Sequence, residues 1–201
     1  MRFVKKYASS ARVLDLGADD SPYQKFFPNR VSVDVEARPG VDVVGDAHAL
    51  PFRDGEFEMI LCTEVLEHLH DPARAISEMR RVLCSNGLLI LTTRFLYPIH
   101  DAPGDYFRFT RYGLEYLLRD WDILELVEES ETQETIGILA HRLGLQARFL
   151  CGPIGKIFAL LWGKFLMVIP NFVRIEFGDV EHSRRERNIM TTGYYVAARK
   201  K

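Results

Sequence analysis

The chain has 201 residues, 47% of them hydrophobic and 27% charged, which is typical of a soluble globular protein with one core, so we expect a single domain over residues 1–201. Its net charge of -2 excludes an overall attraction to nucleic acid, and no nucleic-acid partner is predicted. The three cysteines cannot all pair, and polar residues follow the N-terminal cations where a signal peptide needs an apolar segment, so the chain is expected in the cytoplasm.

Short β-branched or leucine-rich runs alternate with helical stretches in the first half of the chain. The expected strands are residues 12–16, 31–35, 41–44, 59–62 and 88–93. The clearest helix is residues 72–84, with Asp71 as its N-cap, Pro72 at its first position and Asn86-Gly87 as its C-terminal stop. This alternation predicts an α/β fold with a doubly wound, Rossmann-like, mostly parallel sheet.

The second half of the chain is expected to complete this sheet. A helix is predicted to begin after Thr110, a sixth strand at residues 123–127, and an antiparallel last strand at residues 192–198. Roughly sixty residues separate those two strands, far more than a hairpin connection needs. Residues 129–190 are therefore predicted to form a helical insertion before the last strand.

Polar residues follow the ends of four predicted strands. Gly17 breaks the first strand, and such a turn lets the backbone approach a ligand closely. Asp34 ends the second strand, where a carboxylate can accept both hydroxyls of a ribose. Asp46 follows the third strand and Glu64 the fourth. Taken singly, Asp46 or Asp15 could instead cap a turn. As an ordered set at one sheet edge, these positions favour an elongated nucleoside ligand.

The phrases VLDLGA, VDV, GDAHALPF, LCTEVLEHL and RRVLCSNGLLILTT, in this order and spacing, resemble the class I S-adenosylmethionine-dependent methyltransferase superfamily over residues 11–120. The resemblance implies S-adenosylmethionine as cofactor and methyl transfer to a small-molecule or glycan-like acceptor, with oxygen favoured over nitrogen as the acceptor atom. It also implies cofactor contacts from Asp15, Gly17, Ala18, Asp34, Val35, Asp46, Ala47, Thr63 and Glu64.

Each part of the cofactor has its implied residues in this resemblance. Asp15 and Gly17 would line the methionine end, and Asp34 would bind the ribose. Asp46 with Ala47 would hold the adenine. Thr63 and Glu64 would lie near the sulfonium.

One residue departs from the family's pattern, because Asp19 stands where the family usually has a second glycine. A bulkier residue there weakens the case for a tight cofactor site, so a non-catalytic module that binds the cofactor or its product is the alternative. A classical NAD or FAD site is less favoured, since it needs three glycines in this turn. Glu67 and His68 are expected to serve packing and helix-end hydrogen bonding rather than catalysis.

The segment after the fifth strand is predicted to be an active-site loop, since its prolines and glycine are interleaved with aromatic and ionisable residues. His100 is the candidate general base, with Asp101 or Asp105 to orient it. Tyr106 and Arg108 are candidates to bind a polar or anionic acceptor. Alternatively, His100 only anchors the loop and Arg108 pairs with Asp105. The phrase FLYPIHDAPGDYFRFTRYGL is similar to a methyltransferase subgroup associated with bacterial surface-glycan pathways.

An apolar stretch, GPIGKIFALLWGKFLMVIP, lies within the predicted insertion. As a helix, it places Lys156, Ala159, Gly163 and Lys164 on one narrow face and large apolar groups around the rest. Three interpretations stay open: a helix that covers the substrate cleft, a peripheral membrane contact from Pro153 to Ile169, or a contact between two copies.

Overall fold

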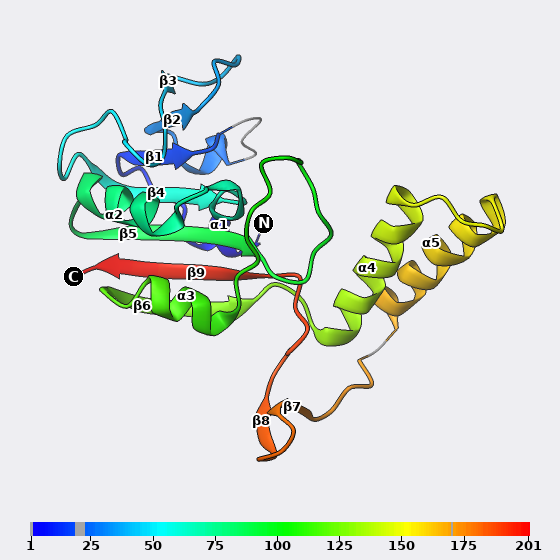
Figure 1. Ribbon diagram of the computed structural model, residues 1–201. Coiled ribbons are helices and arrows are strands. Elements are labelled where there is room, and N and C mark those ends of the chain that lie inside the picture. Colours follow the sequence, from blue (N-terminus) through cyan, green and yellow to red (C-terminus); the bar gives the residue numbers. More distant parts are fainter. Residues whose placement is uncertain (1, 19–22, 170) are drawn as a thin grey trace. The chain divides into compact units, whose positions relative to one another are not determined.

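The computed structural model describes residues 2–18, 23–169 and 171–201, and these form two compact units (Figure 1). The first unit comprises Met1–Arg94, Asp101–Val127 and Tyr194–Lys201, and the second Phe95–His100 and Glu128–Gly193. The predicted insertion, residues 129–190, lies within the second unit. The interpretation of the whole chain as one domain stays a prediction.

A seven-stranded sheet forms the core of the first unit, in the order β3-β2-β1-β4-β5-β9-β6. Strands β1 to β5 pair in parallel, whereas β9 runs in the opposite direction (Figure 1). The predicted doubly wound, mostly parallel sheet with an antiparallel last strand is thus confirmed. The strands are β1 Val13–Leu16, β2 Arg30–Asp34, β3 Val43–Val44, β4 Phe57–Thr63, β5 Leu83–Arg94, β6 Trp121–Glu128 and β9 Gly193–Lys200.

The helices of the first unit begin at the signals that the sequence carries. In α2, Pro72–Val82, the Asp71 side chain accepts a hydrogen bond from the Arg74 amide at 3.0 Å. In α3, Arg111–Leu117, the Thr110 hydroxyl accepts one from the Gly113 amide at 3.1 Å. The remaining helical segments are α1 Arg2–Lys6, η1 Gln24–Phe26 and η2 Leu66–His68.

The predicted helix stop at Asn86-Gly87 is wrong. Helix α2 ends at Val82, and Leu83 already pairs with Phe57 as the first residue of β5. The β4–β5 register then shifts by several residues, and Asn86 takes a left-handed φ of 63°. Asn86-Gly87 therefore forms an irregularity inside β5. Pairing of buried Leu83 with β4 outweighs the preference of Asn86-Gly87 for a helix end.

The second unit is a helical hairpin followed by a short ribbon. Helices α4, Thr132–Gln146, and α5, Pro153–Val168, precede the antiparallel strands β7, Glu176–Asp179, and β8, Arg184–Glu186. The Gln133 amide donates to the carbonyls of Leu166 and Ile169, both at 3.1 Å, and so binds the end of α5 to the start of α4. Among the described residues, no helix is both long and apolar enough to span a bilayer.

Candidate cofactor and active site

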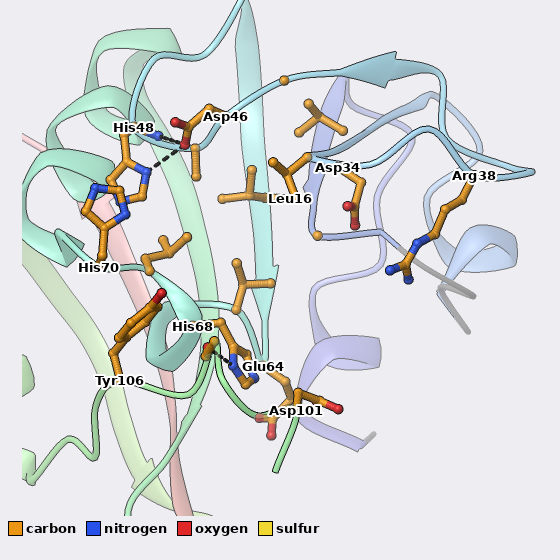
Figure 2. Close-up of a pocket in the computed structure, with 18 residues that line it drawn as sticks. Leu16, Asp34, Arg38, Asp46, His48, Glu64, His68, His70, Asp101 and Tyr106 are labelled. Atoms are coloured by element: carbon orange, nitrogen blue, oxygen red, sulfur yellow. Dashed lines mark hydrogen bonds and ion pairs between the residues drawn. The ribbon is translucent and has the colours of Figure 1, made fainter. Parts of the chain in front are cut away.

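A cavity of about 630 Å³ opens at the carboxyl ends of β1 to β4 in the first unit (Figure 2). From β1 the chain proceeds outward to β2 and β3, then returns to place β4 on the other side of β1. Parallel sheets bind ligands at such a reversal, because the connecting loops there diverge. Six of the predicted cofactor residues line this cavity: Gly17, Asp34, Val35, Asp46, Ala47 and Glu64.

Gly17 ends β1 in a conformation that only glycine adopts easily. Its φ is +68°, and a Cβ added there would overlap the Val65 side chain. Its amide donates to the Val33 carbonyl at 2.9 Å, which ties the turn to β2. The cavity wall at this point is therefore bare backbone.

Asp34 stands at the end of β2, with its carboxylate in the cavity (Figure 2). One oxygen, Oδ1, accepts a hydrogen bond from the Glu36 amide at 3.0 Å, which orients the side chain. Arg38 also lines the cavity and pairs with Glu36 at 2.8 Å. Sequence reasoning missed Arg38, since nothing in the local pattern marks it.

Asp46 is held by a histidine that sequence reasoning also missed. Its Oδ1 accepts hydrogen bonds from the His48 amide at 2.9 Å and from His48 Nδ1 at 2.6 Å. The amide bond from His48 is the main reason that the pKa of Asp46 is lowered. His48 Nε2 accepts from the Asp71 amide at 3.3 Å, and its ring centroid lies 4.0 Å from that of His70. Asp46 is thus an ionised, oriented carboxylate beside two imidazole rings.

Glu64 follows β4 with a left-handed φ of 58°, which is uncommon for a residue with a side chain. Thr92 holds it from β5, because the Thr92 hydroxyl donates to Oε1 at 2.7 Å and its carbonyl accepts from the Glu64 amide at 3.0 Å. Arg94 forms an ion pair with the other carboxylate oxygen. The strained turn aims this carboxylate into the cavity wall.

Glu67 is a fully buried carboxyl group beside the cavity. The Thr93 hydroxyl donates to its Oε2 at 2.7 Å, while Oε1 is buried and has no hydrogen-bond partner among the described residues. Burial, together with the nearby Glu64 carboxylate, raises the pKa of Glu67 to about 7. A proton on Glu67 is therefore favoured by folding.

This raised pKa predicts a stability that falls as pH rises. The unfolded chain releases the Glu67 proton near pH 4.3, so the stabilisation is complete below that pH and is lost as pH rises through about 7. Glu67→Gln should therefore raise the free energy of unfolding at pH 8 by up to about 3 kcal/mol and have little effect at pH 4.5. Urea unfolding at the two pH values measures the difference. The exposed Glu58→Gln is the matched control, and an equal effect of Glu67→Gln at both pH values would contradict the prediction.

His68 lies at the end of η2 and lines the cavity. Its Nδ1 is 2.8 Å from the Gly104 carbonyl oxygen. Because a carbonyl only accepts, Nδ1 carries the proton, and in the neutral ring Nε2 is the basic nitrogen. Tyr106 lines the same end, where its amide donates to the Glu67 carbonyl at 2.9 Å. In Figure 2, Glu64, His68 and Tyr106 lie in the lower part of the cavity and Asp46 in the upper part.

Other predicted site residues are not in the cavity wall. Asp15 is buried with its carboxylate on Arg30, at 2.9 Å, because both faces of β1 are covered. Ala18 and Thr63 are next to wall residues without lining the cavity themselves. Asp19 lies outside the described residues.

Two of the loop candidates, Arg108 and His100, are not among the residues that line the cavity. Arg108 makes a two-point ion pair with Asp105, at 2.5 and 2.7 Å, and does not line the cavity. This is the pairing that the sequence left open as an alternative. His100 belongs to the second unit, where its Nδ1 lies 3.3 Å from the Pro98 carbonyl and its ring meets Tyr97 edge-on.

The sheet order and a ligand-sized cavity at its reversal define the class of protein: an α/β domain that binds a nucleoside-like ligand at its strand ends. Residues 11–91 match the family model of a methyltransferase domain. Over these residues the chain is similar to class I S-adenosylmethionine-dependent methyltransferases, a family in which S-adenosylmethionine is the methyl donor.

Individual relatives show the same similarity over part of the chain, and solved structures share its fold. The ubiquinone biosynthesis O-methyltransferase of Psychrobacter cryohalolentis is 33% identical over 79 residues, 39% of this chain and 26% of that protein. A putative methyltransferase from Bacillus halodurans has the same fold, with a TM-score of 0.59 at 19% identity over 99% of this chain and 97% of that one. So does the 1,6-didemethyltoxoflavin-N1-methyltransferase of Burkholderia thailandensis with bound S-adenosylhomocysteine, with a TM-score of 0.56 at 14% identity over 99% and 75%. The chain spans less than half the length of the first curated relatives that it matches.

Proposed function

We propose that this chain transfers the methyl group of S-adenosylmethionine to an oxygen of a small-molecule acceptor. One observation carries the proposal: a single cavity is lined both by the predicted cofactor residues and, at one end, by His68 and Tyr106. The relative named an O-methyltransferase supports oxygen as the acceptor atom. The relatives described above do not support a glycan-like acceptor or the surface-glycan subgroup, so both stay predictions.

The cavity fits S-adenosylmethionine in size and in the groups that it presents. Its volume of about 630 Å³ lies within the range of ~300–1,000 Å³ common for small-molecule sites. In the proposal, Asp34 accepts the ribose hydroxyls and Asp46 with Ala47 holds the adenine. Gly17 allows the tight turn after β1, since a Cβ there would collide with Val65, and so leaves bare backbone for the cofactor to approach. Bound S-adenosylmethionine supplies an electrophilic methyl group on its sulfonium.

Two further predicted cofactor residues belong to the proposed site. Val35 and Glu64 line the wall and would contact the cofactor directly. Contacts through Asp15, Ala18 and Thr63 stay predictions.

His68 is proposed to accept the proton that a hydroxyl acceptor loses on methylation. Its protonated Nδ1 is held on the Gly104 carbonyl, which leaves Nε2 as the basic atom. The Glu67 carboxyl is close enough for a charge on His68 to lower the pKa of Glu67, so the two side chains are electrostatically coupled. The proposed role of His68 as a base departs from the expectation that it serves packing and helix-end hydrogen bonding rather than catalysis.

Two further groups complete the proposed acceptor site. Tyr106, with its side chain exposed at the cavity, would contact the acceptor. Arg108 would act through Asp105, which it holds, rather than on the acceptor itself. His100 remains the second candidate for the base.

Calorimetry followed by turnover tests the proposal against the non-catalytic alternative. S-adenosylhomocysteine should bind with micromolar affinity, and incubation with S-adenosylmethionine and a panel of phenols and catechols should release S-adenosylhomocysteine. Absence of binding by both cofactor forms at about 1 mM would refute the proposed function. Tight binding with no turnover on any hydroxyl acceptor would favour the non-catalytic module.

A further inference from the structure

Helix α5 presents a continuous apolar surface to solvent, which we call the α5 apolar face. Its large side chains are spaced by three and four residues, so they share one side of the helix. The aromatic rings lie side by side, with centroids 6.3 Å apart for Phe158 and Trp162 and 5.5 Å apart for Trp162 and Phe165. The face consists of six residues that are 47% to 79% exposed: Ile154, Phe158, Leu161, Trp162, Phe165 and Val168.

The opposite side of α5 explains why these residues point outward. Ala159 and Gly163 are buried there against α4. A Cβ added to Gly163 would lie 2.6 Å from the Gly137 carbonyl oxygen, so the two backbones are in direct contact. Rotation of α5 about its axis would drive a large side chain into that contact. The α5 apolar face therefore cannot turn inward within the hairpin.

The hairpin carries an excess of cations, because Glu134, at the start of α4, is the one acidic residue between Thr132 and Val168. Residues 135–175 contain no Asp or Glu and carry five Lys or Arg, although the chain as a whole has a net charge of -2. Two of these cations, Lys156 and Lys164, are exposed on α5 itself. An exposed apolar surface on a cationic segment is complementary to a membrane, whose headgroups can be anionic and whose interior is apolar.

We propose that the α5 apolar face docks on a bilayer that contains anionic phospholipid, with α5 in the plane of the interface. The aromatic and aliphatic side chains would enter the boundary between headgroups and acyl chains, where Trp162 is well suited. Lys164, at the edge of the α5 apolar face, would lie near the lipid phosphates, whereas Lys156, on the side of Ala159, would add to the attraction at longer range. At 16 residues, α5 is shorter than the ~20 residues that a bilayer span requires, which agrees with a helix that lies on the membrane.

A second copy of the chain fits this face less well. Two copies that met through this face would bring together two segments, residues 135–175, that each carry five cations and no acid, so repulsion would oppose the contact. The apolar spacing from Ile154 to Val168 covers about two heptads, fewer than the three to four that a coiled coil needs. Charge and length both favour lipid.

Vesicle flotation of the full chain tests the proposal. The chain should float with phosphatidylcholine vesicles that contain about one-third phosphatidylserine, less with phosphatidylcholine alone, and less at high salt. Phe158→Glu/Phe165→Glu should reduce the floated fraction at least tenfold. Lys156→Glu/Lys164→Glu should weaken binding about fivefold for each cation removed. Tyr116→Glu, which changes an exposed aromatic residue of α3, is the matched control and should float like the wild type.

Absence of wild-type flotation with anionic vesicles would overturn the proposal, and so would undiminished flotation of either double variant. A wild-type dimer that does not float, and that Phe158→Glu/Phe165→Glu converts to a monomer, would show that the face binds a second copy instead. Circular dichroism of the variants verifies that the substitutions at exposed positions leave the helices folded. The measurement does not involve methyl transfer, so its failure would leave the proposed function untouched.

Discussion

Replacing His68 by glutamine is expected to lower kcat by about 10²- to 10⁴-fold, the range that general base catalysis contributes. Glutamine can still donate to the Gly104 carbonyl, so the η2 end should keep its hydrogen bond while the basic Nε2 is lost. Cofactor affinity should stay unchanged, because His68 lies at the acceptor end of the cavity. Release of S-adenosylhomocysteine measures the rate, and calorimetry measures the affinity.

His100→Gln, measured alongside, decides between the two histidines. We expect the larger loss of kcat in His68→Gln, since His68 lines the cavity and its tautomer is set by Gly104. A rate that survives His68→Gln but collapses in His100→Gln would assign the base to His100. A rate that survives both would show that the acceptor needs no histidine.

Asp34→Ala is expected to weaken S-adenosylhomocysteine binding by about 100-fold, since a carboxylate that accepts two hydroxyls contributes about 3 kcal/mol in total. Isothermal titration calorimetry of wild type and variant measures the change. Asp34→Asn should fall between the two, because the amide oxygen can still accept from the Glu36 amide and from one hydroxyl.

The control for this prediction is Glu36→Ala, which removes a carboxylate two residues away that does not line the cavity. It should leave the affinity within about twofold, as expected for a loosely paired surface charge. Equal losses in Asp34→Ala and Glu36→Ala would mean that long-range charge, rather than contact with the ribose, explains the effect.

Much of the site could be predicted from the order of the sequence. Asp34 ends a strand, and Asp46 and Glu64 each follow one. Parallel strands bring their carboxyl ends to one edge of the sheet, so the positions of these residues in the sequence predict that they lie close together in the fold. The role of Asp15 at the methionine end came from the family resemblance instead, and it stays a prediction. In the structure the Asp15 carboxylate is buried on Arg30 of the neighbouring strand, a pairing that the order of the sequence does not predict.

The proton chemistry could not be predicted in this way. The partner that sets the His68 tautomer, Gly104, is 36 residues away in the chain. The pKa of Glu67 depends on burial and on Glu64, which local sequence does not encode. The Arg94–Glu64 ion pair likewise forms across the ends of two neighbouring strands.

The sequence by itself determined the class of protein, the parallel sheet and the edge at which a nucleoside would bind, because hydrophobic periodicity and strand-end residues are local properties. Only the tertiary structure decided which of those residues enter the cavity, which histidines line it, and which side of α5 faces solvent. These depend on contacts between segments far apart in the chain: Gly104 with His68, Arg30 with Asp15, and Gly137 with Gly163.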